Sequence, residues 1–379
     1  MLSFETYNEF EHPVVKETYA VLEQKGEHLL NTSYLWTKTW WDTFRDYEAL
    51  GYNKRLYLIR VLRENKPCAM LALVRYTKTV RKSLGLISYT TLGICGDLWG
   101  ATFEGFIGAL SVEECHELMD YVRCSISYDQ LLFSHIPVTS PLMQVIDNQV
   151  LLSACPTISL GDYADYHEYA QNTYSKKLQR NIRARKKHAI NDGHELTFQS
   201  VSFSDVDFRT LKSLSISKLV SGKHSIYLDS TKARFIMCLL KYHLGNVVVV
   251  RCGEEPVAYR LNFFVGKKKY CVDASYNREF SKYGVGIMSL DASLRDTFES
   301  GQTCHCEGTG VDTYKLECLK TVIPIYVLTE PGNTRKGRLL FPIKLHRMRK
   351  RENAFENELL MLKEKYSLTI PDAKKRVQL

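Results

Sequence analysis

The segment YCVDASYNREFSKYGVGIMSLDASLRDTFESG, residues 270–301, carries the clearest fold signal in the chain. Its aromatic and β-branched start predicts a strand. A short loop containing Gly284 and Gly286 follows, and a helix is expected to begin there because apolar residues recur at spacings of three and four. These residues are Ile287, Leu290, Leu294 and Phe298. Backbone N–H groups at such a helix start attract anions, and glycine lets a phosphate approach closely. The segment therefore predicts a site for a phosphate-bearing cofactor.

The composition is that of an ordinary soluble globular protein. The 379 residues are 45% hydrophobic and 25% charged, and the length suggests two domains. The net charge of +9 favours anionic partners such as coenzyme A, nucleotide sugars, nucleic acid or membrane headgroups. The polar N-terminus has no secretory pattern, and the eleven cysteines form no CxxC pair. A cytoplasmic protein with reduced thiols is expected.

Two similar halves are predicted. The runs at 55–64 and 68–79 form a strand hairpin with a Pro-containing charged turn, and the runs at 246–252 and 257–266 repeat this pattern. Trp36, Trp40, Trp41 and Phe44 are spaced like one face of a helix before the first hairpin. We infer a duplicated α/β unit with mixed sheets, and we expect a basic helical tail after the second half.

Several motifs of the second half resemble those of the CelD/BioF2-like acetyltransferase group. This group belongs to the GNAT superfamily and is related to the FemAB-type peptidoglycan aminoacyltransferases. The motifs are SKKLQRN at 175–181, GEEPVA at 253–258, YN at 276–277, Gly284, and Gly308 followed by Tyr314 and Lys315. The resemblance covers most of residues 160–325.

This resemblance implies tandem GNAT-like domains at 1–158 and 159–335 and a tail at 336–379. It also implies an acyltransferase that moves an acyl group, most simply acetyl, from acyl-CoA to an amino or hydroxyl group. The expected acceptor is an amino sugar or another intermediate of surface polysaccharide or envelope assembly, which includes nucleotide-linked or lipid-linked sugars.

Donor binding is assigned to the strand end and the loop. Backbone amides of the loop residues would hold the pyrophosphate, and Lys282 would add positive charge. The strand end at Val272 and Ala274 would lie along the pantetheine arm. The loop residues are Ser281, Lys282, Tyr283, Gly284, Val285 and Gly286. GNAT enzymes usually have Gln or Arg where this chain has Ser281.

Acyl transfer needs a polarised carbonyl, an acid for the leaving thiolate and a base for the nucleophile. Tyr314 is the candidate acid; the alternative is a packed aromatic ring at a strand start. Asp273 and Glu307 are the candidate bases, since they end neighbouring predicted strands, although Asp273 equally suits a turn cap. His224 is a rival base on the acceptor side.

The acceptor side is assigned to basic residues. Lys315 would hold an acceptor phosphate or carboxylate, unless it is an exposed strand lysine. Between Tyr174 and Ile190 a helix is expected with an apolar stripe and a basic face that includes Lys176 and Arg180. This face would contact an anionic acceptor or the CoA 3′-phosphate, or be simply solvated. Nucleic acid is disfavoured because no aromatic residues alternate with the cations.

Other function classes remain. The second hypothesis is an aminoacyl-tRNA-dependent transferase of the FemAB type, which shares the tandem fold. The third hypothesis is a non-catalytic binding module of the same fold. No metal site is expected, because alternation along a strand separates His305 from Cys304 and Cys306. The basic run 344–351 suits either an anionic membrane surface or solvent.

Overall fold

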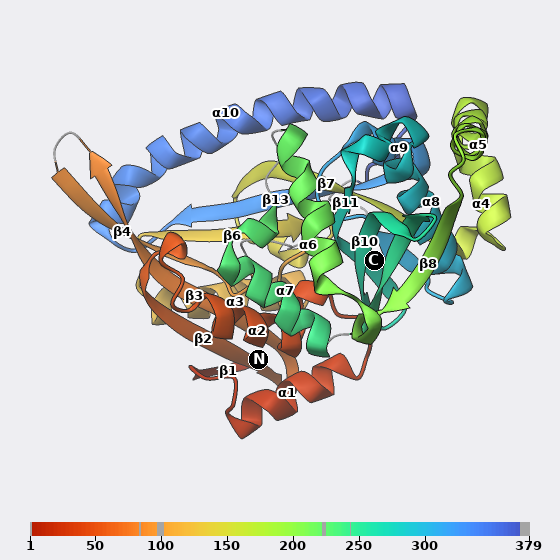
Figure 1. Ribbon diagram of the computed structural model, residues 1–379. Coiled ribbons are helices and arrows are strands. Elements are labelled where there is room, and N and C mark those ends of the chain that lie inside the picture. The colour runs from red at the N-terminus through yellow and green to blue at the C-terminus, as the bar shows by residue number, and fades with distance from the viewer. Residues whose placement is uncertain (1, 83–84, 97–101, 222–224, 243, 372–379) are drawn as a thin grey trace. The chain divides into compact units, whose positions relative to one another are not determined.

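The computed structural model describes residues 2–82, 85–96, 102–221, 225–242 and 244–371 (Figure 1). The chain divides into two compact units. Unit 1 comprises residues 1–154, 323–361 and 371–379, and unit 2 comprises residues 155–322 and 362–370. The division falls inside a strand, and the polypeptide returns to unit 1 after completing most of unit 2. Within the described residues, no helix is both long enough and apolar enough to cross a bilayer.

Unit 1 is a mixed sheet with helices. Its elements are β1 (Leu2–Tyr7), α1 (Pro13–Glu23), α2 (Tyr34–Phe44), β2 (Tyr52–Arg63), β3 (Lys66–Lys82), β4 (Gly85–Ile94), β5 (Ile107–Gly108), α3 (Val112–Ser125), β6 (Gln130–Pro137), the start of β7 (Asn148–Ser159), most of β13 (Thr321–Pro331) and the first part of α10 (Arg335–Tyr366). The strand order is β1-β2-β3-β4-β6-β13, antiparallel except for the parallel β4–β6 pair.

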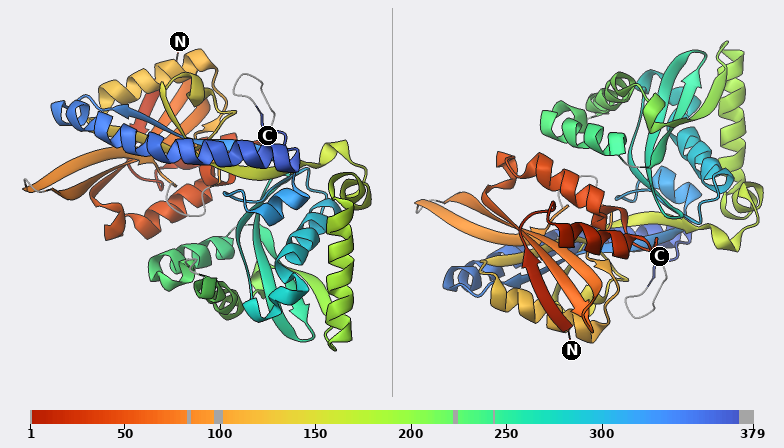
Figure 2. Two further views of the ribbon diagram at one scale, coloured as in Figure 1. Left: turned by 90° about the horizontal axis from the view of Figure 1, so that it is seen from above. Right: turned by 90° about the horizontal axis from the view of Figure 1, so that it is seen from below.

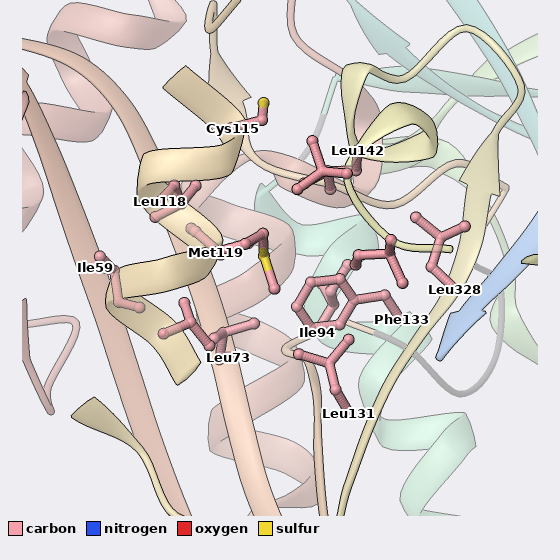
Figure 3. Packing of buried hydrophobic residues seen from close by; sticks show 14 of the residues in the cluster. Ile59, Leu73, Ile94, Cys115, Leu118, Met119, Leu131, Phe133, Leu142 and Leu328 are labelled. Atoms are coloured by element: carbon pink, nitrogen blue, oxygen red, sulfur yellow. The ribbon is translucent and has the colours of Figure 1, made fainter. Parts of the chain in front are cut away.

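The core of unit 1 forms where α3 packs on the sheet. Leu118 and Met119 of α3 lie against Ile59 and Leu73 of β2 and β3, and Phe133 of β6 closes the cluster (Figure 3). The helix begins at a capping box in which Ser111 and Glu114 each accept a hydrogen bond from the other's backbone N–H. The aromatic helix predicted before the first hairpin is α2, and Trp36, Trp40 and Phe44 are buried.

Unit 2 repeats the strand pattern of unit 1. Its elements are α4 (Tyr166–Thr173), α5 (Lys176–Asn191), β8 (Leu196–Ser202), α6 (Phe208–Ile216), α7 (Ser230–Tyr242), β9 (Gly245–Cys252), β10 (Glu255–Val265), β11 (Lys268–Tyr276), α8 (Val285–Glu299), β12 (Cys304–Cys306) and α9 (Thr313–Cys318). The order β8-β9-β10-β11-β12-β7 is antiparallel except for the parallel β11–β12 pair. α6 lies on one face of this sheet and α8 on the other (Figure 2). The predicted duplication is therefore confirmed strand by strand.

Both predicted hairpins are present. The first turns at Glu64 and Asn65, which both adopt positive φ, as a two-residue turn of type I′ requires. The second turns at Gly253 and Glu254, and Gly253 has φ +58°. The helix predicted after Gly284 is α8, and its apolar face at Ile287, Leu290 and Leu294 is buried. The predicted C-terminal helix is α10.

Candidate functional site

A cavity of about 570 Å³ lies within unit 2. It is bordered by the last residues of β11, the start of α8, the loop after β12 and the start of α9. The lining residues are Arg185, Lys218, Arg260, Cys271, Val272, Asp273, Ala274, Ser275, Tyr276, Arg278, Ser281, Gly284, Gly286, Ile287, Ser289, Glu307, Gly308, Thr309, Asp312, Thr313, Tyr314, Lys315 and Glu317. Most of the predicted donor-site and catalytic residues are therefore close together in space.

One edge of β11 opens onto this cavity. β11 pairs with β12 only from Lys268 to Tyr270, whereas its pairing with β10 continues to Tyr276. Among the residues that the structure describes, β11 therefore has no strand partner on the cavity side beyond Tyr270. An unpaired strand edge presents N–H and C=O groups to a ligand that lies along it. Val272 and Ala274, predicted to follow a pantetheine arm, both line the cavity at this edge.

The predicted phosphate loop is more ordered than the sequence suggested. Residues Arg278–Tyr283 form a 3₁₀ helix, and the Gly284 N–H donates to the Ser281 carbonyl at 2.9 Å. Because a 3₁₀ helix bonds each N–H to the carbonyl three residues earlier, the amides from Ser281 to Gly284 have partners. The amides that remain for an anion are those of the first turn of α8, which begins at Val285.

Gly284 is required at the junction of the two helices. It has φ +66°, and a Cβ at this position would lie 2.4 Å from a guanidinium nitrogen of Arg185. Arg185 thus crosses from α5 to the start of α8 and adds positive charge where the helix dipole is also positive. The sequence showed Arg185 only as one cation of the basic helix, and nothing in its spacing indicated this contact.

Lys282 and Tyr283 anchor the loop rather than line the cavity. Lys282 Nζ and the Tyr283 hydroxyl lie 2.8 Å and 2.7 Å from the same Asp192 oxygen, at the end of α5. These two hydrogen bonds lower the pKa of Asp192 to about 2. Val285 is buried in the cluster that contains Tyr283 and Ala189, so its side chain also faces away from the cavity.

A buried ionic network forms part of the cavity wall. The Arg260 side chain, 1% exposed, forms an ion pair with Glu307, and the other Glu307 carboxylate oxygen lies 2.8 Å from His305 Nε2. Arg260 Nε also donates to the Ser289 hydroxyl at 3.2 Å, and His305 Nδ1 lies 3.1 Å from the Thr297 hydroxyl. Both oxygens of Glu307 are thus already bonded within the protein. Arg260 was not identified from the sequence, because a single arginine in a strand pattern gives no such signal.

Burial and nearby cations hold the pKa of His305 well below its ordinary value. Burial contributes most, and the charges of Lys269, Arg260 and Lys315 act in the same direction. The imidazole is therefore neutral near pH 7. A neutral ring carries a single N–H group, which can donate to the Glu307 carboxylate.

Asp273 lies within β11, three residues before the strand ends at Tyr276 rather than at its end as predicted, and it lines the cavity as Glu307 does. One oxygen of its carboxylate pairs with Lys218 Nζ at 2.6 Å, and the other accepts a hydrogen bond from the buried Tyr259 hydroxyl. Lys218 lines the cavity and was missed in the sequence, where it had no distinguishing context.

Residues 313–318 form the short helix α9, whereas the sequence alternatives placed a strand there. A strand is prevented because the preceding loop folds back around Lys315. The Lys315 Nζ donates to the carbonyls of Glu307, Thr309 and Gly310 at 3.1–3.3 Å, which uses all three of its N–H donors. Lys315 is thus buried and braces the loop. Tyr314 lines the cavity, and the Arg260 guanidinium lies 5.7 Å from its ring centre.

Two further residues assigned to the acceptor side lie outside the cavity. Lys176 and Arg180 are exposed on α5, and neither lines the cavity. His224 falls outside the described residues. On β12, the sulfurs of Cys304 and Cys306 are 3.9 Å apart on one face, while His305 points to the other, as alternation predicts. Among the described residues, no group of three or more potential ligands is arranged to hold a metal ion.

This geometry lies in a segment that is similar to a known protein family. A model of the acetyltransferase (GNAT) domain matches residues 176–316, which include every cavity-lining residue except Glu317. Residues 176–316 are a GNAT domain. The matched segment contains both the open edge of β11 and the start of α8. A search of curated proteins found no match.

Solved structures share the fold over most of the chain. The crystal structure of FemX is 12% identical and has a TM-score of 0.59, with 90% of this chain and 100% of that chain covered. The C-terminal domain of a putative lysylphosphatidylglycerol synthetase from Agrobacterium fabrum is also 12% identical, with a TM-score of 0.51 over 87% of this chain and 95% of that one. The chain thus has a GNAT-type acyltransferase fold related to that of FemX.

Proposed function

We propose that this protein is an acyltransferase that moves an acyl group, most simply acetyl, from acyl-CoA to an amino or hydroxyl group. The observation that carries the proposal is the cavity of about 570 Å³ between the open edge of β11 and the start of α8. An acyl-CoA supplies an activated thioester. Its extended pantetheine arm matches an unpaired strand edge, and its pyrophosphate matches a helix N-terminus.

The donor-binding residues follow from this match. Val272 and Ala274 would accompany the pantetheine arm with their backbone groups. The first amides of α8, at Val285 and Gly286, would bind the pyrophosphate together with the Arg185 guanidinium. Gly284 gives this side chain the room to reach the helix start. Ser281 lines the cavity and is within the same loop.

Tyr314 is proposed as the acid that protonates the leaving thiolate. It lines the cavity, and its ring centre lies 5.7 Å from the Arg260 guanidinium. Asp273 is proposed as the base rather than Glu307. Both carboxylates are paired with a cation. Lys218, the partner of Asp273, is more exposed than Arg260, so the ion pair of Asp273 is easier to break.

The acceptor is proposed from the family resemblance to be an amino sugar or another intermediate of surface polysaccharide or envelope assembly. Arg278, which also lines the cavity, suits an acceptor that carries phosphate. A nucleotide-linked or lipid-linked sugar has this chemistry.

Aminoacyl-tRNA is the second candidate donor, and the exposed basic face of α5 favours it. No acidic residue lies between Ser175 and Asn191, so this helix offers a strong positive potential to a nucleic acid backbone. The fold shared with FemX is compatible with either donor.

Ligand-induced stabilisation separates these functions. At about 100 times its dissociation constant, acetyl-CoA should raise the free energy of unfolding by about 2.7 kcal/mol. Tyr314→Phe should then lower kcat more than it weakens donor binding. Stabilisation by aminoacyl-tRNA but by no acyl-CoA would transfer the assignment to the aminoacyl reaction. No response to either would contradict both and leave a binding module.

A further inference from the structure

The first half of α10 carries charge of one sign. Residues 335–351 contain eight Lys or Arg and no Asp or Glu. This helix belongs to unit 1 as far as residue 361, and it has no part in the cavity described above. Its basic residues therefore need a separate explanation.

The helix packs against unit 1 with one side only. Gly337 and Phe341 are buried there, and the neighbouring Lys336 pairs with Asp129 at 3.0 Å. Lys344 lies over the Tyr89 ring and 3.1 Å from the Gln130 side-chain oxygen. These contacts fix which side of the helix faces outward.

The outward side combines exposed cations with an exposed apolar pair. Leu339 is 77% exposed and Ile343 is 48% exposed, one helical turn apart. Six exposed cations surround this pair, and within the described part of the chain none of them forms an ion pair with a carboxylate. They are Arg335, Arg338, Arg347, Arg349, Lys350 and Arg351, and with Leu339 and Ile343 they make up what we call the basic face of α10.

We propose that the basic face of α10 binds the surface of a membrane that contains anionic lipid. Cations arranged around exposed apolar side chains are the chemistry of interfacial helices, in which the apolar residues enter the headgroup boundary while the cations meet lipid phosphates. The surface acts independently of acyl transfer, although it would bring the protein to lipid-linked substrates.

Nucleic acid fits this face less well than a membrane. Binding of single strands uses aromatic rings on which bases stack, and the one aromatic residue of the segment, Phe341, is buried. Exposed leucine and isoleucine contribute nothing to phosphate contacts, whereas they add to membrane affinity through apolar burial.

The test is cosedimentation of the full-length protein with vesicles of phosphatidylcholine, with and without phosphatidylglycerol. Binding should require phosphatidylglycerol. Arg338→Glu combined with Lys350→Glu should lower the partition coefficient at least about tenfold, because each basic residue at the surface contributes separately. Leu339→Ser combined with Ile343→Ser should remove the part of binding that persists at high salt.

The chain offers two matched controls. Leu360 and Met361 are 58% and 72% exposed near the other end of α10 among acidic residues, so Leu360→Ser with Met361→Ser should leave binding unchanged. Arg180→Glu with Lys187→Glu makes the same charge change on α5 and should also have little effect. The proposal is overturned by absence of binding to anionic vesicles, by equal losses in the α5 variant, or by tighter binding to RNA than to vesicles through the same residues.

Discussion

Glu307 is the residue on which the buried network depends. Glu307→Gln keeps the shape of the side chain but leaves the Arg260 guanidinium buried without a counter-charge. We expect the free energy of unfolding in urea to fall by about 3–5 kcal/mol. Lys282→Gln breaks an exposed pair with Asp192, which solvent screens, and should cost much less stability.

A paired replacement distinguishes charge from packing at this position. Arg260→Met combined with Glu307→Leu removes both charges, so it should destabilise the protein less than Glu307→Gln alone. A double variant that is less stable than the single one would show that the ion pair itself, rather than an uncompensated charge, stabilises the unit.

His305 makes stability depend on pH in a defined direction. Because its folded-state pKa lies below the ordinary value of 6.5, the unfolded chain takes up a proton that the folded chain does not. This contribution to stability is complete above pH 6.5 and is lost as the pH falls below it, by up to about 1.4 kcal/mol per pH unit. His305→Gln should flatten the urea-unfolding free energy between pH 6.5 and pH 5 relative to the parent. An identical slope in both proteins would show that His305 does not carry the effect.

At the scale of elements, the junction of the 3₁₀ helix and α8 gives a paired test. Gly284→Ala places a Cβ on a residue with φ +66° and brings it against Arg185. Gly253→Ala has a similar backbone cost, at φ +58°, but its Cβ would meet no heavy atom of the described residues within 4 Å. Both should lose about 1–2 kcal/mol of stability. Only Gly284→Ala should also weaken CoA binding in calorimetry, because it displaces Arg185. Equal affinities of the two variants would remove Arg185 from the donor site.

The elements with regular periodicity could be predicted from the sequence, and those made by tertiary contacts could not. Ile287, Leu290 and Leu294 predicted α8 because the helical spacing of apolar residues can be recognised within one short segment. In contrast, α9 depends on the Lys315 ammonium binding three carbonyls, and the position of Arg185 depends on how α5 packs. The carboxylates Asp273 and Glu307 both line the cavity, but their strands do not end together, because β12 ends opposite Tyr270 whereas β11 continues to Tyr276. Their partners Lys218 and Arg260 come from other elements and left no local pattern.

At the scale of the whole molecule, the sheet of unit 1 is completed by a strand from elsewhere in the chain, whereas that of unit 2 is not. The sixth strand of unit 1 is β13, which follows nearly all of unit 2, and the sixth strand of unit 2 is the end of β7. The hairpins revealed the duplication. The return of β13 to unit 1 has no sequence signature, because β13 is an ordinary buried strand. The two units therefore differ in whether they are continuous in sequence.

This difference predicts how fragments of the chain behave. Residues 1–154 lack β13, so β6 would lose its antiparallel partner, and the buried side chains Ile325 and Leu328 would be missing from unit 1. We expect this fragment to bind a hydrophobic dye and to unfold without a cooperative transition in urea, and a peptide of residues 321–361 added in trans should restore cooperativity. Residues 155–322 hold nearly all of unit 2 and should unfold cooperatively alone. Cooperative unfolding of residues 1–154 without the peptide would mean that β13 is dispensable to unit 1.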